Sequence, residues 1–326
     1  MFTIGMTHQI PLDTCRNQLE GFRIIAPETG KFDRNEIISA ISECDAFFFM
    51  LDVKCDEELL AHAPRLKVVG NLGSGFDNVD VDACTKRGIM VLNTPCSVIA
   101  PTSEMTMALI LAITRNVVGY DRTFRADRTC HKELLCERDM CLEGKRLGVL
   151  GFGRIGKAVA KKALAFGMQI SYYDVYRATP EVETEYHATY RASAEEVLRE
   201  ADVVTIHMAY TPSNWHFINK ERLAIMKATA YLVNASRGPI VCEEDLYKCL
   251  KHHGIRGAAM DVHESEPHVS EKIASLENVV ITPHISTNIA EIRLNMLQEL
   301  TTGVHSVLVD HEVPRNLVNR DVVKRG

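Results

Sequence analysis

The stretch that decides the fold reads Gly151-Phe152-Gly153-Arg154-Ile155-Gly156. The apolar run at 146–150 before it predicts a strand, and residues 157–164 after it predict a helix. In such a unit the first glycine allows a tight turn, the second lets the backbone approach a pyrophosphate, and the third lets the helix pack against the strand. The N–H groups at the start of the helix attract phosphate oxygens. The stretch therefore predicts a phosphate-binding turn in a strand-turn-helix unit.

An acidic residue at the expected distance strengthens this interpretation. A second apolar run, at 168–173, ends in Asp174, 18 residues after Gly156. A carboxylate about 20 residues after the glycine motif is placed to accept hydrogen bonds from the adenosine ribose hydroxyls. Together the two features favour a dinucleotide site over an ordinary glycine turn. Because a carboxylate repels a 2′-phosphate, NAD is expected over NADP, although Arg177 nearby would soften that preference.

The composition limits the class of protein. With 326 residues, the chain is long enough for about two domains, and its 46% hydrophobic content is typical of a globular protein. The net charge of -6 without a basic block argues against nucleic acid as a partner. Ten cysteines are scattered without a CxxC pair, so we expect reduced thiols in a cytoplasmic protein and no metal site. We see no signal peptide, and the longest apolar stretch, at 105–113, is too short to span a membrane.

Strands and helices alternate on both sides of the glycine stretch. Before it, strands are predicted at 2–5, 22–26, 46–50, 66–69 and 89–92, and helices near 12–19, 34–43, 56–62 and 79–87. After it, strands are predicted at 147–150, 168–173, 203–207, 231–234, 257–260 and 279–282. This alternation predicts α/β architecture, with parallel sheets that helices cover on both faces.

Two long helices divide this series. One is predicted to begin at Pro101 and to include about 25 residues, because proline suits the first helical turn. The other is predicted near Asn288, where Asn288 and Glu291 have the spacing of a capping box. We therefore predict two doubly wound domains: a dinucleotide-binding domain over 101–287, inserted into a domain formed by 1–100 and 288–326. The two helices would act as a hinge, and a ligand is expected in the cleft between the domains.

Polar residues follow three predicted strands of the second series. Arg237 follows the strand at 231–234, a group of acids that includes Glu266 follows 257–260, and His284 follows 279–282. Each alone has an ordinary explanation, but ligands of open α/β sheets lie at the carboxyl ends of the strands. A guanidinium grips a carboxylate with two hydrogen bonds, an imidazolium donates a proton, and a neighbouring carboxylate favours the protonated imidazole. With a hydride from the dinucleotide, this set predicts the reduction of a 2-keto acid.

At this point the sequence resembles a known family, the D-isomer-specific 2-hydroxyacid dehydrogenases, which includes glyoxylate and hydroxypyruvate reductases, phosphoglycerate dehydrogenases and D-lactate dehydrogenases. The motifs that carry the resemblance lie at 71–80, 91–95, 151–156, 234–238, 261–267 and 282–285. The resemblance implies a flavodoxin-like substrate domain and an inserted Rossmann NAD-binding domain. It implies hydride transfer between NAD(H) and a small D-2-hydroxy acid or 2-keto acid of the glyoxylate, hydroxypyruvate or pyruvate type. It also implies a homodimer, formed through the crossing helix and an arm at 115–145.

The resemblance assigns roles to single residues. It implies that Arg237 binds the substrate carboxylate, that His284 is the acid/base and that Glu266 pairs with His284. Substrate would also be bound by the backbone N–H groups of a loop in the first domain, formed by Leu72, Gly73, Ser74 and Gly75. Cofactor contacts are implied for Gly151, Gly153, Arg154, Ile155, Gly156, Asp174, His207, Thr211, Ala235, Asp261 and His284.

Two alternatives stay open. NAD(H)-sensing corepressors of the same superfamily keep the arginine, the acid and the histidine, and a dehydrogenase of phosphite would use the same arginine. Turnover of a 2-keto acid would separate these functions. The residues at 96–99 provide no cation for a phosphate, so we expect a small unphosphorylated acid.

Overall fold

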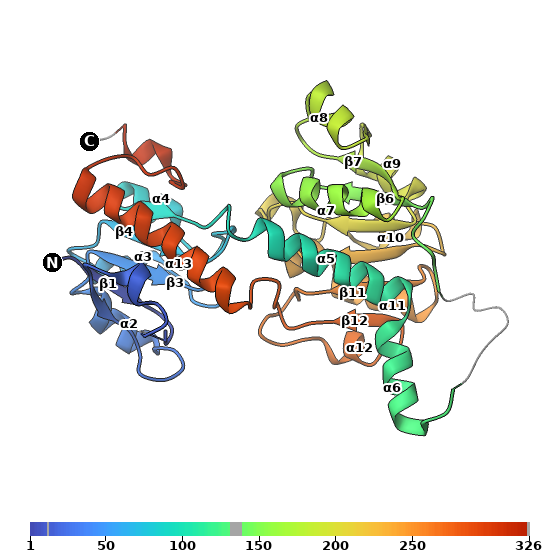
Figure 1. Cartoon of the computed structure of the whole chain (residues 1–326), viewed down its shortest axis with the longest axis horizontal. Coiled ribbons are helices and arrows are strands. Elements are labelled where there is room, and N and C mark those ends of the chain that lie inside the picture. Colours follow the sequence, from blue (N-terminus) through green and yellow to red (C-terminus); the bar gives the residue numbers. More distant parts are fainter. Residues whose placement is uncertain (12, 131–138, 325–326) are drawn as a thin grey trace. The chain divides into compact units, whose positions relative to one another are not determined.

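The computed structural model describes residues 1–11, 13–130 and 139–324, and the chain divides into two compact units (Figure 1). Unit 1 comprises Met1–Val98 and Asn288–Gly326, and unit 2 comprises Ile99–Thr287. The second unit is therefore an insertion within the first.

Unit 1 contains one sheet of five parallel strands in the order β2-β1-β3-β4-β5. The strands are β1 (Thr3–Met6), β2 (Arg23–Ile25), β3 (Ala46–Phe49), β4 (Val68–Asn71) and β5 (Met90–Leu92). The helices are α1 (Arg16–Leu19), α2 (Arg34–Ile41), α3 (Glu57–Ala61), α4 (Val81–Lys86) and α13 (Ala290–His305), which a π-helical turn at Ser306–Asp310 follows. This strand order is that of flavodoxin-like sheets, as the sequence predicted.

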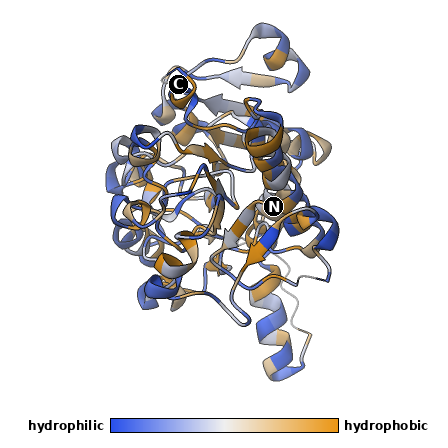
Figure 2. Ribbon diagram, turned by 90° about the vertical axis from the view of Figure 1, so that its left-hand side faces the viewer, coloured by the Kyte–Doolittle hydropathy of each residue, from blue (hydrophilic) through white to orange (hydrophobic). Residues whose placement is uncertain are grey.

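Strand β3 shows why the sheet is covered on both faces. Its four residues are all buried, which is typical of a central parallel strand. Successive side chains alternate between faces: Phe47 and Phe49 pack in one hydrophobic cluster, and Phe48 packs in the other. The first cluster includes residues of α2, α3 and α4, and the second includes residues of α1 and α13. Figure 2 shows the hydrophobic residues concentrated along the strands.

Unit 2 contains seven parallel strands in the order β12-β11-β10-β9-β6-β7-β8. The strands are β6 (Arg146–Leu150), β7 (Gln169–Tyr173), β8 (Ala188–Tyr190), β9 (Val203–Ile206), β10 (Tyr231–Asn234), β11 (Gly257–Met260) and β12 (Val279–Ile281). The order reverses between β6 and β9, and ligands of such sheets bind at this reversal point, outside the carboxyl ends of the strands. The predicted class of two doubly wound parallel sheets is therefore confirmed.

The helices of unit 2 cover both faces of its sheet. They are α5 (Ile99–Thr114), α6 (Val117–Asp127), α7 (Arg154–Ala165), α8 (Pro180–Glu185), α9 (Ala194–Glu200), α10 (Lys220–Ala224), α11 (Glu243–Lys251) and α12 (Glu271–Ala274), with short 3-10 turns at Pro212–Asn214 and Gly238–Ile240. Residues of α5 and α7 share one hydrophobic cluster, and residues of α9, α10, α11 and α12 share the other. None of the helices in the described ranges combines the length and the apolar character needed to cross a bilayer.

The structure differs from the sequence prediction at both long helices. The helix predicted after Pro101 is divided into α5 and α6, because Asn116 adopts a left-handed conformation with φ 46°. Helix α13 begins after Ile289, whose side chain makes no capping hydrogen bond, so the predicted capping box of Asn288 and Glu291 is wrong. Asn288 lies one residue too early to act as the N-cap.

Candidate active site

The glycine loop after β6 has the geometry that a bound dinucleotide requires. Gly151 has φ +95°, and a Cβ on it would lie 2.6 Å from the backbone nitrogen of Met208. A Cβ on Gly156 would lie 2.2 Å from the carbonyl oxygen of Gly151, so only glycine fits at either position. In contrast, a Cβ on Gly153 would meet no protein atom within 4 Å. The space at the exposed N-terminus of α7 is therefore open to phosphate groups.

Asp174 follows β7 and is held against the glycine loop. Its carboxylate accepts hydrogen bonds from the backbone N–H of Phe152 at 2.6 Å and of Tyr176 at 3.3 Å. The strand that carries Asp174 neighbours the strand that precedes the glycine loop. The predicted dinucleotide acid is therefore next to the predicted phosphate site.

Arg177 is held by an ion pair of its own. Its guanidinium donates two hydrogen bonds to Glu183, at 2.9 and 3.0 Å, and lies over the ring of Tyr190. Glu183 also accepts a hydrogen bond from the hydroxyl of Tyr172 at 2.8 Å. The hydrogen bonds from Arg177 and Tyr172 hold the pKa of Glu183 below its ordinary value, and Glu183 holds the pKa of Arg177 above its own. Arg177 is therefore paired with a carboxylate of its own unit.

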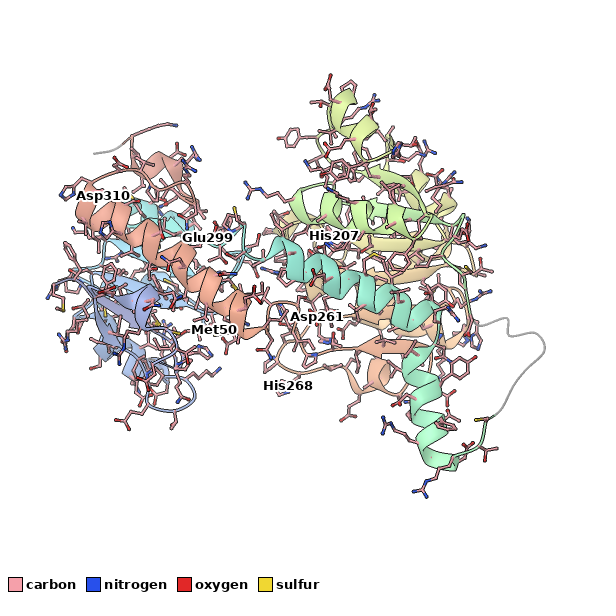
Figure 3. All side chains as sticks on the ribbon, in the orientation of Figure 1. Met50, His207, Asp261, His268, Glu299 and Asp310 are labelled. Atoms are coloured by element: carbon pink, nitrogen blue, oxygen red, sulfur yellow. The ribbon has the colours of Figure 1, made fainter. Side chains whose placement is uncertain are left out.

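Two predicted cofactor residues follow β9. The ring of His207 hydrogen-bonds the hydroxyl of Thr205 at 2.9 Å, and burial lowers the pKa of His207 to about 3 (Figure 3). The ring is therefore neutral at physiological pH. Thr211 is exposed, and its backbone N–H donates to the side chain of Asn214 at 2.8 Å.

The loop after β10 is shaped by its own side chains. Asn234 accepts a hydrogen bond from the backbone N–H of Ser236 at 3.0 Å and donates one to the carbonyl oxygen of Arg237 at 2.9 Å. Ala235, another predicted cofactor residue, is buried. A Cβ on Gly238 would lie 1.9 Å from a carbonyl oxygen of the loop after β11, so glycine is required there. This close contact brings the loop of Arg237 against the next loop of the sheet.

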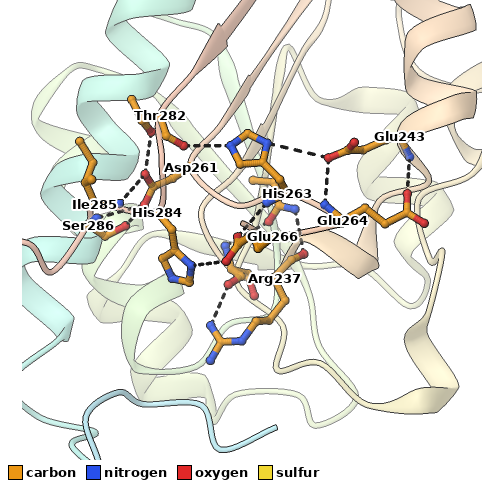
Figure 4. A network of polar contacts seen from close by, with 12 residues as sticks. Arg237, Glu243, Asp261, His263, Glu264, Glu266, Thr282, His284, Ile285 and Ser286 are labelled. Carbon is orange, nitrogen blue, oxygen red and sulfur yellow. Dashed lines mark hydrogen bonds and ion pairs between the residues drawn. The ribbon is translucent and has the colours of Figure 1, made fainter. Parts of the chain in front are cut away.

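Glu266 and His284 form a hydrogen-bonded pair, which is an ion pair when the ring of His284 is protonated. The Oε2 atom of Glu266 lies 2.9 Å from Nδ1 of His284, and its Oε1 atom accepts the backbone N–H of His263 at 2.9 Å (Figure 4). Burial raises the pKa of Glu266, but the hydrogen bond and charge of His284 outweigh burial, so the pKa lies below its ordinary value. His284 has φ 53°, an uncommon conformation for a residue other than glycine. Such backbone strain is concentrated at functional sites.

Asp261 orders the segment that carries His284. Its fully buried carboxylate accepts hydrogen bonds from the hydroxyl of Thr282, the backbone N–H of Ile285, and the backbone N–H and hydroxyl of Ser286. The backbone N–H of His284 also donates to the carbonyl oxygen of Asp261 at 2.7 Å. The structure therefore shows that this carboxylate holds the loop after β12, a role that the sequence prediction did not include.

His263 connects the loops of Glu266 and His284 but was missed by the sequence prediction. Its buried ring lies with Nε2 at 2.9 Å from the carbonyl oxygen of Thr282, and its backbone N–H binds Glu266. A carbonyl oxygen only accepts, so Nε2 of His263 carries a proton. The one available signal was its position within the acidic motif, three residues before Glu266.

A second acidic cluster lies behind this pair. The carboxylate of Glu264 accepts a hydrogen bond from the backbone N–H of Glu243 at 3.0 Å. The carboxylate of Glu243 accepts one from the backbone N–H of Glu264 at 2.9 Å. Glu264 also lies 2.6 Å from Nε2 of His216, and Glu243 lies 3.8 Å from Nδ1 of His263. These contacts join residues that are far apart in the sequence, so no local pattern indicates them.

The loop at 72–75 belongs to unit 1, where its carbonyl oxygens are occupied. The carbonyl oxygens of Gly73 and Ser74 accept hydrogen bonds from residues 94 and 93, and Asn71 donates to the carbonyl oxygen of Gly75. The N–H of Gly73 donates to the carbonyl oxygen of Asn71 at 2.9 Å. In the part of the chain that the structure describes, the N–H groups of Ser74 and Gly75 have no hydrogen-bond acceptor. These two are therefore the groups of this loop that a ligand can occupy.

The sheet order, the glycine loop and Asp174 are typical of a dinucleotide-binding α/β protein, and the residues present fit such a cofactor. The profile of the family described as "D-isomer specific 2-hydroxyacid dehydrogenase, NAD binding domain" matches residues 107–286. The chain is 40% identical to a glyoxylate reductase of Thermococcus litoralis over 89% of its length and 88% of that protein. It is 38% identical to a glyoxylate reductase of Pyrococcus furiosus over 98% of its length and 96% of that protein.

Solved structures lead to the same family. A D-lactate dehydrogenase from Aquifex aeolicus, complexed with NAD and lactic acid, is 29% identical and superposes with a TM-score of 0.80 over 97% of this chain and 99% of that one. The chain belongs to the D-isomer specific 2-hydroxyacid dehydrogenase family. It is an oxidoreductase of 2-hydroxy and 2-keto acids with an NAD-binding domain of this family, and the corepressor alternative is not favoured.

Proposed function

We propose that this enzyme reduces a small 2-keto acid of the glyoxylate, hydroxypyruvate or pyruvate type with NADH, and catalyses the reverse oxidation of the D-2-hydroxy acid. The glyoxylate reductases among its relatives support this substrate class. The observation that carries the proposal is the 2.9 Å hydrogen bond between His284 and Glu266 at the carboxyl ends of β11 and β12.

His284 is proposed to move the proton. A carboxylate only accepts hydrogen bonds, so the pairing with Glu266 places a proton on Nδ1 of His284. The Nε2 atom is then the one that faces the substrate and donates to the carbonyl oxygen in reduction. In oxidation the same atom, deprotonated, accepts the hydroxyl proton. Glu266 stabilises the charged ring in both directions.

Arg237 is proposed to bind the substrate carboxylate. Its loop follows β10, and β11 and β12 follow in order across the sheet, so Arg237, Glu266 and His284 all lie beyond the same edge. A guanidinium matches the two oxygens of a carboxylate and orients it. We further propose that the N–H groups of Ser74 and Gly75 bind carboxylate oxygens. Leu72 and Gly73 would shape this loop.

The residues around the glycine loop are proposed to hold the cofactor. When bound, NAD(H) supplies or accepts the hydride. The N–H groups at Arg154 and Ile155 would bind the pyrophosphate, and Asp174 would bind the adenosine ribose. We propose that His207, Thr211, Ala235 and Asp261 line the remainder of the site.

We propose that NAD is preferred to NADP. Asp174 places a negative charge where a 2′-phosphate would lie. The cation nearest along the chain, Arg177, is paired with Glu183 by two hydrogen bonds. It is therefore engaged by a carboxylate instead of being available to a phosphate.

We propose a cytoplasmic homodimer. Helix α6 has no buried residue and exposes the large hydrophobic side chains of Val117, Val118, Tyr120 and Phe124, which a second copy of the chain would cover. Part of the predicted dimer arm, at 131–138, lies outside the described residues. Nine cysteines in the described ranges are free thiols, as in a reducing compartment.

A panel of 2-keto acids with NADH and NADPH tests the proposal. We expect turnover of glyoxylate, hydroxypyruvate or pyruvate, with NADH preferred. Arg237→Lys should lower kcat/KM by at least about tenfold, because a lysine cannot form the two parallel hydrogen bonds of the guanidinium. Normal turnover by this variant on every keto acid would contradict the role of Arg237, and no turnover by the unmodified enzyme would contradict the proposed function.

A further inference from the structure

Unit 1 contains a cavity of about 320 Å³ at the carboxyl end of its sheet. Its walls are mostly apolar and come from the ends of β1, β3 and β4, from the segment between β1 and α1, and from α13. They include the side chains of Met6, Ile10, Phe48, Leu72 and Leu297. Leu72 is the first residue of the loop that we propose binds the substrate carboxylate. The cavity therefore adjoins the proposed position of the substrate within this unit.

Arg293 is the arginine that lines this apolar cavity, and His8 lines it as well. Within the described ranges, its guanidinium has no hydrogen-bond acceptor and no ion-pair partner. Burial lowers the pKa of Arg293. Arg293 is the fourth residue of α13, near the positive end of the helix dipole, where a cation is unfavourable. The fold therefore places a half-buried positive charge, without a partner among the described residues, beside an apolar cavity.

Two carboxylates of neighbouring segments, those of Asp52 and Glu299, are engaged elsewhere. Asp52 lies 2.8 Å from Lys31 and 3.4 Å from His8. Glu299, on the same helix as Arg293, accepts hydrogen bonds from the hydroxyl of Ser97 at 2.7 Å and from its backbone N–H at 3.2 Å (Figure 3). A buried charge is costly unless an opposite charge accompanies it. A ligand with an anionic group would provide that charge.

We propose that the cavity holds the side-chain end of the substrate, and that Arg293 pairs there with a second acidic group. The enzyme then favours 2-keto acids with a distal carboxylate or phosphate over uncharged analogues of equal length. This inference rests on the proposed reaction and extends its substrate class to 2-keto acids that carry a second acidic group. It departs from the expectation of an unphosphorylated acid, which considered only residues 96–99, because Arg293 lies on α13, almost 200 residues later in the chain.

Matched substrates test the proposal. The kcat/KM with NADH is measured for 2-oxoglutarate against 2-oxopentanoate, which differ in the distal carboxylate, and for phosphohydroxypyruvate against hydroxypyruvate. We expect the unmodified enzyme to prefer the charged member of at least one pair. The pair in which this preference occurs identifies carboxylate or phosphate as the distal group. Arg293→Gln should reduce that preference by at least about tenfold, since a hydrogen bond to a charged group is lost. Arg293→Lys should retain most of it.

The controls separate the possible failures. Arg315→Gln removes an exposed arginine of the same unit and should leave the preference unchanged. If the unmodified enzyme and Arg293→Gln showed the same preference for the charged substrate, the inference would be overturned. In that case, turnover of uncharged keto acids would still support the proposed function. No turnover of any keto acid would end the proposed function itself.

A second measurement keeps the inference testable if Arg293→Gln does not fold. The unreactive acids glutarate and pentanoate are compared as inhibitors of the unmodified enzyme. We expect glutarate to compete with the keto acid and to bind at least about tenfold more tightly than pentanoate. Equal binding, or inhibition that does not compete with the keto acid, would overturn the inference.

Discussion

Replacing Glu266 by glutamine tests the proton-transfer pair most directly. In the structure the Oε1 atom of Glu266 accepts the backbone N–H of His263, and its Oε2 atom lies 2.9 Å from Nδ1 of His284. Glutamine has the same shape, and its single oxygen can still accept from His263. Its NH₂ group then faces Nδ1 of His284. A donor at this position favours a ring that carries its proton on Nε2 only and opposes the charged ring.

The structure also indicates the size of the effect. A hydrogen bond to a charged group is worth about 1.5–3 kcal/mol, which corresponds to about 10- to 100-fold. The side chain of Glu266 is 37% exposed, so solvent screening places the expected loss near the lower limit, at about tenfold for reduction at neutral pH. A tenfold loss corresponds to a shift of about one pH unit in the rate profile. The rate of reduction by Glu266→Gln should therefore decline at a lower pH than the rate of the unmodified enzyme. Oxidation should fall by at least about 100-fold, because a ring protonated on Nε2 cannot accept the hydroxyl proton.

The assay is the initial rate of NADH consumption and formation over a series of pH values. The folded-state pKa of Glu266 lies below the ordinary 4.5, so its charge is retained above that pH and is lost only as the pH falls through the lowered pKa. The profile of the unmodified enzyme should therefore show no loss from Glu266 near neutral pH. Glu277→Gln, which changes an exposed acid of the same unit, is the control. If both variants gave the same rates and pH profile in both directions, the pairing would play no part in catalysis.

Two further predictions concern the cofactor site. Gly156→Ala would place a Cβ 2.2 Å from the carbonyl oxygen of Gly151, so we expect a loss of about 1–3 kcal/mol in unfolding free energy and weaker NADH binding. Gly153→Ala has open space for its Cβ, so its thermal stability should be unchanged, but its binding of NADH should weaken. Normal NADH binding by both glycine variants would contradict the proposed phosphate site. Glu183→Gln should release Arg177 and lower the ratio of kcat/KM for NADH to that for NADPH by about twofold to fivefold, the range expected for an exposed pair. An unchanged ratio would show that this ion pair does not affect cofactor choice.

Part of the candidate site could be predicted because it depends on local sequence. The glycine stretch at 151–156 and Asp174 act through their positions after neighbouring strands, and their spacing indicates a dinucleotide site without long-range information. Arg237, Glu266 and His284 follow three strands of one parallel sheet. Because the carboxyl ends of parallel strands meet at one edge, the strand order alone predicts that these residues share an edge.

Features that depend on contacts across the chain were not predictable in this way. Strand β8 is three residues long at the edge of its sheet, and Asn116 interrupts a helix that its sequence would allow to continue. The buried ring of His263 and the four donors around Asp261 are recognisable only when the loops after β11 and β12 are placed side by side.

The sequence by itself determined the class of fold and the family, and it indicated the chemical types of the proposed proton-transfer residues, since these follow from periodicity, motif spacing and strand order. Apart from the Glu266–His284 pair, which the resemblance implied, the tertiary structure alone decided which carboxylates pair with which cations. It pairs Arg177 with Glu183 and leaves Arg293 within an apolar cavity. The physical reason is that the electrostatic energy of a charge depends on its burial and on its neighbours in space, and a residue's position in the chain specifies neither.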